Sequence, residues 1–348
     1  MRIAQVAPLF VRIPPERYGG TERVVHALTE ALVARGHEIT LFAAGGTQTS
    51  ADLHATSPAP LWEMGVSDPL AYRVLQAEEL VQRSAEFDVV HSHLDYLPWL
   101  AGERLRAPVI TTMHGRLDLP ELRTLLATMG QWPLISISDA QRRPVADVDL
   151  NWIATVHNGL DLASTYTLGE GGGGYLVFLG RIAPEKDPVT AISVAIRAGV
   201  PLKIAARVDP IDQEYFDCEV RPLLEHPLVE WVGELDDAGK NELLGRALAL
   251  LMPVNWDEPF GLSFIEALAC GTPVISTPRG SLPEIVRPGV DGFLCAGQEA
   301  LVRACHEVAR LDRSVCRAGA LERFSTETMT SGYEAAYQAV LEGKLLVA

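Results

Sequence analysis

Two glutamates that flank a short turn offer the clearest chemistry in this sequence. The stretch Glu258-Pro-Phe-Gly-Leu-Ser-Phe-Ile-Glu266 follows the apolar run 247–254, and its proline and glycine mark a turn between a strand and a helix. Glu258 is therefore expected at the carboxyl end of the strand, and Glu266 about two turns into the helix. Carboxylates in these places can accept hydrogen bonds from sugar hydroxyls and from a ribose diol, which indicates a sugar nucleotide as ligand.

The start of the same helix is a second candidate for ligand binding. The first turn of a helix leaves backbone N–H groups without partners, and Gly261, Leu262 and Ser263 would supply them to a phosphate or a sugar oxygen. The alternative interpretation makes Glu258 a solvated loop acid and Glu266 a surface position on an amphipathic helix. The run around Glu266 is apolar on nearly all sides, so its carboxylate needs a partner and a ligand is a candidate.

Two cations and two glycines stand at other junctions between a strand and a helix. Arg181 can hold a diphosphate with two hydrogen bonds and Lys186 can add a point charge, unless both are ordinary exposed cations. The pair Gly19-Gly20 precedes the first long helix, where the main chain can approach a ligand closely. A plain tight turn with Thr21 as the helix cap is the alternative there.

A histidine, His114, ends the predicted strand 109–113 and is followed by glycine. A lone histidine in such a position is more often a hydrogen-bonded structural residue than a ligand group. It also lies at the end of the sheet that binds ligands in α/β proteins. Contact with a sugar is therefore the second interpretation of this residue.

Short apolar strands alternate with helix-length segments along the chain, a pattern that predicts parallel sheets joined by crossover helices. In the first half, strands are expected at 2–7, 38–43, 88–91, 109–113, 134–137 and 154–157, with helices at 20–35 and 68–85. In the second half, strands are expected at 175–180, 202–208, 229–232, 247–253 and 273–276, with helices at 188–198, 237–246 and 260–270.

The repeated alternation over 348 residues predicts an α/β protein with two Rossmann-like domains facing a central cleft. We expect an N-terminal domain at 1–168 and a C-terminal domain at 169–326. The segment 165–174 is rich in glycine and lacks apolar periodicity, so a flexible linker is expected there. The last segment, 327–348, is helix-like and could cap either domain, including by packing back on the first.

The formal net charge of −16 argues against binding to duplex DNA and against broad binding to anionic lipid, since both require a basic patch. The five cysteines show no Cys-x-x-Cys spacing and are interpreted as free thiols in a reducing compartment, which predicts a cytoplasmic protein. No run reaches the ~18 apolar residues of a membrane span. We therefore expect no nucleic-acid partner and no transmembrane segment, while peripheral contact with a membrane stays open.

Together these motifs resemble the family 4 glycosyltransferases, which are retaining enzymes with the two-Rossmann-domain architecture called GT-B. The resemblance extends from residue 1 to about residue 295. The matching residues are Gly19-Gly20-Thr21-Glu22-Arg23, His114-Gly115, Ser136-Ile137-Ser138, His157-Asn158-Gly159, Gly180-Arg181 through Lys186, Glu258 through Glu266, and Gly271-Thr272-Pro273-Val274-Ile275.

The resemblance implies a role for each residue on the donor side. Arg181 and Lys186 would bind the diphosphate of a nucleoside-diphosphate sugar, and Glu266 would hold the nucleotide ribose. Glu258, together with the main-chain amides of Phe260, Gly261 and Leu262, would hold hydroxyls of the donor sugar. Glu258 is therefore the first of two catalytic candidates.

The second catalytic candidate is His114, which the resemblance places against the same sugar from the other domain. Gly19 and Gly20 would approach the diphosphate or the acceptor. The family is described by front-face substitution, in which the leaving phosphate assists deprotonation of the acceptor. No side-chain nucleophile, no metal and no cofactor besides the donor substrate are therefore expected.

The acceptor is a hydroxyl of a small molecule, a glycan or a lipid, and its selection would depend on the loops 9–18, 94–100 and 116–122. Three other readings remain. A metal-dependent single-domain glycosyltransferase would use Asp147-Val148-Asp149. A nucleotide-sugar epimerase would rearrange the sugar without an acceptor. A sensor or catalytically weak partner subunit would bind the nucleotide sugar without turnover.

Overall fold

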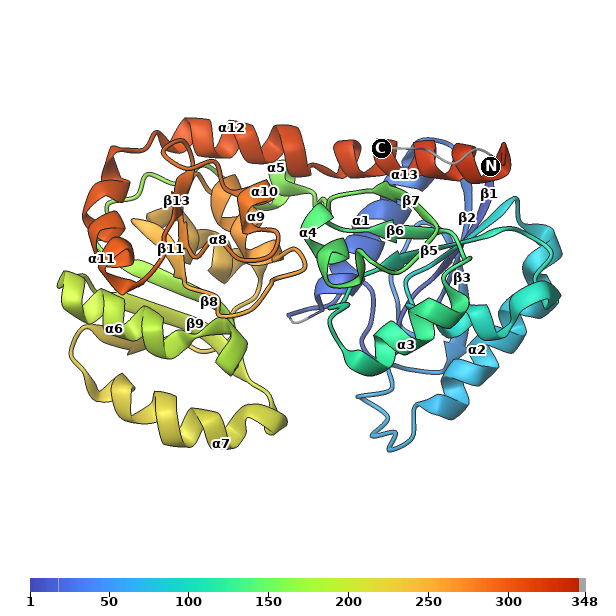
Figure 1. The fold of residues 1–348 in the computed structure, drawn as a ribbon, viewed down its shortest axis with the longest axis horizontal. Coiled ribbons are helices and arrows are strands. Elements are labelled where there is room, and N and C mark those ends of the chain that lie inside the picture. The colour runs from blue at the N-terminus through green and yellow to red at the C-terminus, as the bar shows by residue number, and fades with distance from the viewer. Residues whose placement is uncertain (18, 344–348) are drawn as a thin grey trace. The chain divides into compact units, whose positions relative to one another are not determined.

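The computed structural model describes residues 1–17 and 19–343, apart from the side chain of Glu103. Tyr18, in the first of the loops expected to select the acceptor, and 344–348, the end of the helix-like segment, lie outside the described residues. The chain forms two compact units, Met1–Leu160 with Thr326–Ala348 and Asp161–Ser325. Each is an α/β unit built on one parallel sheet, as predicted (Figure 1).

The first unit contains a seven-stranded sheet in the order β3-β2-β1-β4-β5-β6-β7, and all its neighbouring strands are parallel. The strands are β1 (Arg2–Val6), β2 (Glu38–Ala44), β3 (Asp52–Ser57), β4 (Val89–Ser92), β5 (Val109–Met113), β6 (Leu134–Ser136) and β7 (Trp152–Thr155). The helices are α1 (Gly20–Ala34), α2 (Leu70–Arg83), α3 (Pro120–Met129), α4 (Asp139–Arg142) and α13 (Thr326–Leu341).

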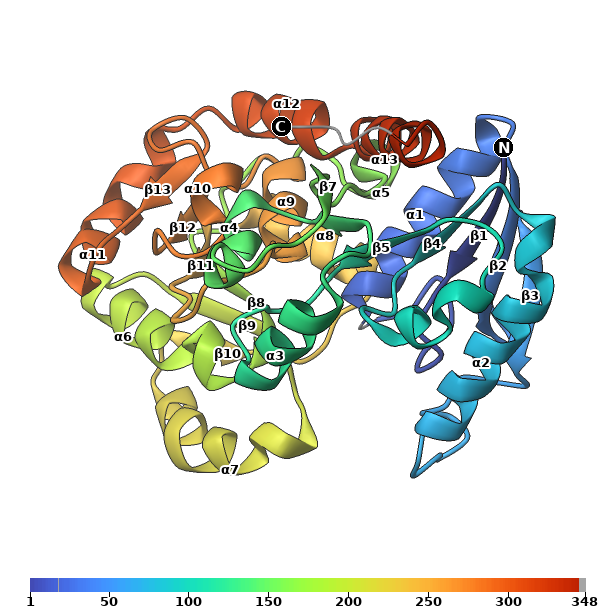
Figure 2. The same ribbon diagram turned by 45° about the vertical axis from the view of Figure 1, so that its right-hand side comes forward.

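The two faces of this sheet are covered by different helices. Phe42 of β2 packs in an apolar cluster with Leu80 of α2, whereas its neighbour Leu41 packs with Val25 of α1. This follows from the alternation of side chains along a strand. The C-terminal helix α13 belongs to this unit and lies beside α1 (Figures 1 and 2).

The second unit contains a six-stranded parallel sheet in the order β10-β9-β8-β11-β12-β13. Its strands are β8 (Leu176–Ile182), β9 (Leu202–Val208), β10 (Val229–Trp231), β11 (Ala249–Met252), β12 (Val274–Ser276) and β13 (Gly292–Leu294). Its helices are α5 (Leu162–Thr165), α6 (Pro188–Ala198), α7 (Gln213–Tyr215), α8 (Asp237–Arg246), α9 (Leu262–Ala269), α10 (Leu282–Ile285), α11 (Gln298–Glu307) and α12 (Arg313–Phe324).

The glycine-rich segment between the predicted domains is fastened to the second unit. The backbone N–H of Gly169 donates to Cys270 O, and that of Gly171 donates to Gly245 O. Arg313 then donates to the carbonyls of Gly169, Gly245, Ala247 and Cys270. The predicted flexible linker is therefore wrong, because these hydrogen bonds hold the segment along a folded surface.

The preceding residues 161–168, which the sequence analysis placed in the first domain, also belong to the second unit. Asp161 caps α5, and the N–H of Thr167 donates to Asn241 Oδ1 in α8. Tyr166 is buried and accepts a hydrogen bond from Lys240 Nζ. The boundary consequently falls at Leu160 and Asp161.

Each sheet has a switch point, where the connections from one strand leave in opposite directions. In the first unit β1 lies between β2 and β4, and in the second unit β8 lies between β9 and β11. Ligands of open α/β sheets bind in the crevice at the carboxyl ends of such strands. Ligand-binding residues are therefore expected in the loops that follow β1, β4, β8 and β11.

None of the helices in the described part of the chain combines the length and the apolar character needed to cross a membrane.

Candidate active site

The loops that follow β8 and β11 bring Lys186 and Glu258 into contact at the switch point of the second unit. Lys186 Nζ forms an ion pair with Glu258 Oε2, and Trp256 Nε1 donates to the same oxygen at 3.1 Å. The Lys186 ammonium also lies 5.2 Å from the centre of the Trp256 ring. Glu258 is only 6 % exposed, so the interpretation as a solvated loop acid is wrong.

The loop after β12 fixes the position of the Glu258 loop. The N–H of Ser281 donates to Glu258 O at 2.9 Å, and Ser281 Oγ donates to Phe260 O at 2.7 Å. Gly280 has a φ of 55°, and a Cβ there would lie 2.3 Å from the backbone of Glu258. Only glycine fits this approach without moving the backbone that carries the carboxylate.

Gly261 begins helix α9 next to this carboxylate. It has a φ of 89°, and a Cβ on it would lie 2.5 Å from the Phe264 ring and 3.2 Å from Glu258 Cγ. The N–H groups of Gly261, Leu262 and Ser263 donate to no other residue within the described chain. These N–H groups and the helix dipole can hold a phosphate or a sugar oxygen.

Glu266 lies in the second turn of α9, nearer the start of the helix than expected, and its carboxylate has a protein partner. Lys240 Nζ of α8 donates to Glu266 Oε1 at 2.8 Å and also contacts Asp237 at 2.9 Å. Glu266 is 4 % exposed and Lys240 is 8 % exposed. Surface placement is therefore wrong for Glu266. Its other oxygen, Oε2, makes no hydrogen bond with the described residues and can accept one from a ligand.

Arg181, at the end of β8, lies among acidic side chains. Its guanidinium pairs with Glu185, with Asp212 at 3.2 Å and with Asp209 at 3.5 Å. Burial raises the pKa of the Asp212 carboxyl. A diphosphate at Arg181 would have to take over at least one of these contacts, so this cation is less ready for a ligand than Lys186.

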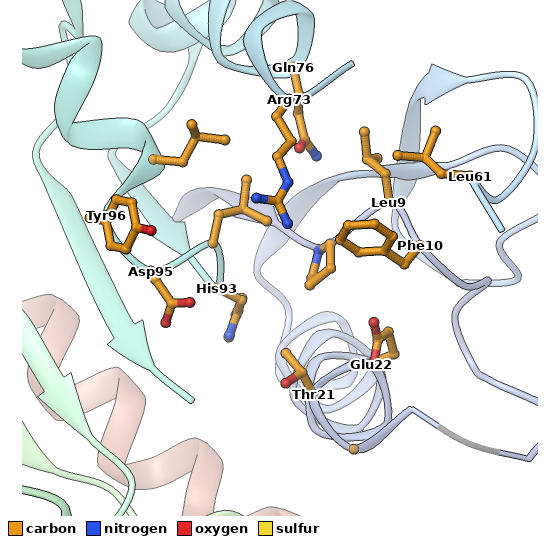
Figure 3. A pocket seen from close by; sticks show the side chains of 14 residues that line it. Leu9, Phe10, Thr21, Glu22, Leu61, Arg73, Gln76, His93, Asp95 and Tyr96 are labelled. Carbon is orange, nitrogen blue, oxygen red and sulfur yellow. The ribbon is translucent and has the colours of Figure 1, made fainter. Parts of the chain in front are cut away.

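A pocket of about 310 Å³ opens at the switch point of the first unit, between the loops after β1 and β4 (Figure 3). Its lining includes Gly20 and Glu22 at the start of α1, Arg73 of α2, Phe10 after β1, and Asp95 after β4. Burial raises the pKa values of Glu22 and Asp95. The two carboxylates can accept hydrogen bonds from hydroxyl groups. The pocket also contains the guanidinium of Arg73, which lies 5.1 Å from the centre of the Phe10 ring.

His114 lies directly after β5 and next to this pocket through His93, which lines it. The Nδ1 of His93 and the Nε2 of His114 are 2.8 Å apart. Burial lowers the pKa of His114 to about 4, so its ring is neutral near pH 7. Gly19 is the N-cap residue of α1 with a φ of 146°, and a Cβ there would clash with Pro15 at 2.9 Å. The N-cap is thus Gly19 and not Thr21.

The predicted residues therefore fall into two groups, one in each unit. Lys186 and Glu258 meet directly, whereas Glu266 pairs with Lys240, which the sequence analysis did not single out. In the described chain no cluster of His, Cys, Asp or Glu has the arrangement of a metal site. Asp147, of the Asp-x-Asp motif, pairs with Arg123.

This combination of two parallel α/β units, each with a polar switch point, defines the GT-B class of fold. Residues 18–164 match the family described as Glycosyltransferase Family 4, and residues 169–318 match the family described as Glycosyl transferases group 1. The chain belongs to the family 4 glycosyltransferases and is a hexosyltransferase-type enzyme.

Two curated relatives cover most of the chain. A phosphatidyl-myo-inositol mannosyltransferase of Mycobacterium leprae is 26 % identical over 98 % of this chain and 97 % of its own length. A D-inositol 3-phosphate glycosyltransferase of Mycolicibacterium smegmatis is 27 % identical over 85 % of this chain and 80 % of its own length.

Solved structures show the same fold. AviGT4, a glycosyltransferase involved in avilamycin A biosynthesis, has a TM-score of 0.74 with 24 % identity, covering 98 % of both chains. Anabaena Alr3699/HepE in complex with UDP and glucose has a TM-score of 0.75 with 18 % identity, covering 97 % of this chain and 100 % of that one.

Proposed function

We propose that the protein is a retaining glycosyltransferase that moves a hexosyl group from a nucleoside-diphosphate sugar to an acceptor hydroxyl without a bound metal ion. The observation that carries the proposal is the ion pair of Lys186 with the buried Glu258 beside the open start of α9. It places a cation for phosphate, a carboxylate for sugar hydroxyls and free N–H groups at one switch point. The UDP and glucose bound by the HepE neighbour support the same class of donor.

The diphosphate would be held by Lys186, by the start of α9 and by Arg181. An ammonium has three N–H donors, so Lys186 can keep its contact with Glu258 and still donate to a phosphate oxygen. Glu266 would take a ribose hydroxyl on Oε2 while Lys240 holds Oε1. Charge that develops on the leaving diphosphate then meets donors that are already in place, which lowers the barrier to its departure.

The sugar carbon would be attacked from the same face that the diphosphate leaves, and the leaving phosphate would take the proton of the acceptor hydroxyl. Glu258 already accepts hydrogen bonds from Lys186 and Trp256. These contacts fit a carboxylate that orients sugar hydroxyls, and they fit less well a nucleophile that attacks the sugar carbon. His114 would contact the same sugar. The role of the protein is therefore to position two substrates and to stabilise charge.

The acceptor would occupy the pocket of the first unit. Glu22 and Asp95 can accept hydrogen bonds from hydroxyls, and Arg73 makes no hydrogen bond through its guanidinium to any described residue. We infer an acceptor with several hydroxyls and an anionic substituent. The names of the two curated relatives support this class, because both describe inositol compounds that carry phosphate. A small molecule, a glycan or a lipid headgroup can all meet the requirement, and the five free thiols favour a cytoplasmic location.

The experiment that tests the function is product analysis with an α-linked donor chosen by a thermal-shift screen of UDP, GDP and ADP. Ligand at ~100 times its dissociation constant adds about 2.7 kcal/mol to the stability of the folded state, which identifies the base. Proton NMR should then show an α-linked product. A β-linked product would contradict retention, and a rearranged free sugar nucleotide would indicate an epimerase.

Turnover is expected to survive exhaustive treatment with EDTA, because Lys186, Arg181 and the start of α9 meet the charge of the diphosphate. Initial rates before and after chelation give the measurement. Complete loss of activity that Mg²⁺ restores would refute metal independence, and Asp147 and Asp149 would then be the residues to replace.

Lys186→Ala is expected to weaken binding of the nucleoside diphosphate by roughly 1.5 to 3 kcal/mol, the range for hydrogen bonds to charged groups. Arg181→Ala should fall at the lower end of that range, because its guanidinium is already shared among three carboxylates. Calorimetry with the diphosphate and the monophosphate gives the measurement, and the monophosphate should lose less. Arg197→Ala, which removes an exposed ion pair with Glu299 in the same unit, is the control. Unchanged affinity in both site variants would disprove this placement of the donor.

A further inference from the structure

Helix α13 inserts two tyrosines into a buried polar network under the sheet of the first unit. Tyr337 accepts a hydrogen bond from Gln5 Nε2 at 3.0 Å, and its hydroxyl lies 2.8 Å from His91 Nδ1. All three side chains are fully buried. A polar group buried this deeply costs free energy if it loses its hydrogen bond, because no water can replace the partner. The donor and acceptor roles of neighbouring groups in the network are therefore strongly coupled.

One branch of the network leads from Tyr337 to the candidate catalytic histidine. Gln5 Oε1 lies 2.8 Å from His93 Nε2, and His93 Nδ1 lies 2.8 Å from His114 Nε2. His93 is 3 % exposed. A continuous chain of hydrogen bonds therefore connects the C-terminal helix, the first strand and the loops after β4 and β5.

The direction of each hydrogen bond in this branch follows from the chemistry of the groups. Burial lowers the pKa values of His91 and His93 well below the usual range, so both rings are neutral and each carries a single N–H. The amide nitrogen of Gln5 faces Tyr337, so its oxygen faces His93 and can only accept. His93 must then carry its hydrogen on Nε2, which leaves Nδ1 to accept from His114 Nε2.

We propose that Tyr337, acting through Gln5 and His93, fixes His114 in the tautomer that carries its hydrogen on Nε2. The Nδ1 atom of His114 is then a hydrogen-bond acceptor for a hydroxyl of the bound sugar. This assignment makes Tyr337 a positioning residue for His114, and it rests on the proposed contact between His114 and the donor sugar.

The orientation of the Gln5 amide is the decisive element, because the opposite orientation would reverse every step. With the amide nitrogen toward His93, His93 would carry its hydrogen on Nδ1, and His114 would have to accept on Nε2 and carry its own hydrogen on Nδ1. The ring would then present a donor to the sugar. The hydrogen bond that Gln5 Nε2 donates to the Tyr337 oxygen belongs to the first arrangement.

The other branch provides a matched control. His91 Nε2 lies 2.7 Å from Thr112 Oγ1, and Thr112 Oγ1 donates to Tyr333 at 3.2 Å. Tyr333 is as deeply buried as Tyr337 and belongs to the same helix. Its hydroxyl ends this branch, which joins the path to His114 only at His91.

The first test is nitrogen NMR of the whole protein labelled with ¹⁵N-histidine, with the His114 signals assigned by their loss in His114→Asn. We expect a protonated Nε2 and an unprotonated Nδ1 for His114, and the same pattern for His93. A hydrogen on Nδ1 of His114 would overturn the proposal. This measurement needs no substrate, so it separates failure of the tautomer assignment from failure of the proposed transferase function.

The second test compares Tyr337→Phe with Tyr333→Phe. Tyr337→Phe should leave His114 as a mixture of tautomers and lower kcat/KM for the donor by ~10-fold or more, as expected when the support of a site residue is lost. Tyr333→Phe should keep the single tautomer and the activity. In the His114→Asn background, Tyr337→Phe should cause no further loss. Equal effects of the two tyrosine variants on the His114 signals would refute a specific role of Tyr337.

Discussion

Glu258→Gln is expected to reduce turnover by ~10² or more while affinity for the nucleoside diphosphate stays nearly unchanged. Glutamine keeps the shape of the side chain and one accepting oxygen, but it removes the charge that pairs with Lys186 and receives the Trp256 N–H. Hydroxyls of the donor sugar would then be held by a neutral group in a buried site. Steady-state kinetics gives the turnover number, and calorimetry gives the affinity for the diphosphate.

Asp147→Asn is the matched control for this variant, because it removes a carboxylate charge from an exposed pair with Arg123 in the first unit. It should leave turnover unchanged. Parallel loss of diphosphate affinity and turnover in Glu258→Gln would contradict the assigned role. A sugar ester trapped on Glu258 would replace front-face substitution with double displacement.

Lys240→Met is expected to lower the free energy of unfolding by about 3 to 5 kcal/mol, the range for removing one partner of a buried ion pair. The ammonium is the hydrogen-bond donor to Glu266 Oε1 and to Tyr166, and it lies 2.9 Å from Asp237. Without it, a carboxylate that is 4 % exposed loses its only charged partner among the described residues. Urea titration followed by circular dichroism gives the measurement.

Lys203→Met provides the control, because the ion pair of Lys203 with Glu230 is partly exposed and should contribute no more than about 1 kcal/mol. The double variant Lys240→Met/Glu266→Leu should regain most of the lost stability, since no buried unpaired charge then remains and Asp237 is partly exposed. If Lys240→Met and Lys203→Met lowered the free energy of unfolding equally, burial would not determine how much the ion pair of Lys240 with Glu266 contributes to stability.

The fold could be predicted from sequence because the signals of its strands and helices are local. Strands such as β5 and β9 are rich in apolar and β-branched residues and are bounded by turn residues, and their predicted ranges match the structure. The edge strand β3 was missed, because its sequence Asp-Leu-His-Ala-Thr-Ser is polar and its first half is largely accessible to solvent. An edge strand needs no continuous apolar pattern, so its pairing with β2 leaves little trace in sequence.

The partners of the site residues could not be predicted, because pairing depends on distant parts of the chain. Glu258 is paired with a lysine that precedes it by 72 residues, and Glu266 with one that precedes it by 26. The apolar surroundings of Glu266 correctly indicated that its carboxylate needs a partner. The sequence analysis proposed a ligand for this role, whereas the structure shows the buried Lys240. In the same way, the glycine-rich segment lacks periodicity, and its attachment through Arg313 is set by a helix far along the chain.

The placement of α13 in the first unit has a consequence for the order in which the protein is made. The second unit is one continuous stretch of chain, whereas the first unit needs Tyr333 and Tyr337 to complete its core around Gln5 and His91. Domains fold as they leave the ribosome, N-terminal parts first. In this protein, polar groups in the core of the N-terminal sheet stay unpaired until α13 is synthesised. The unit whose translation begins first is therefore the one whose folding is completed last.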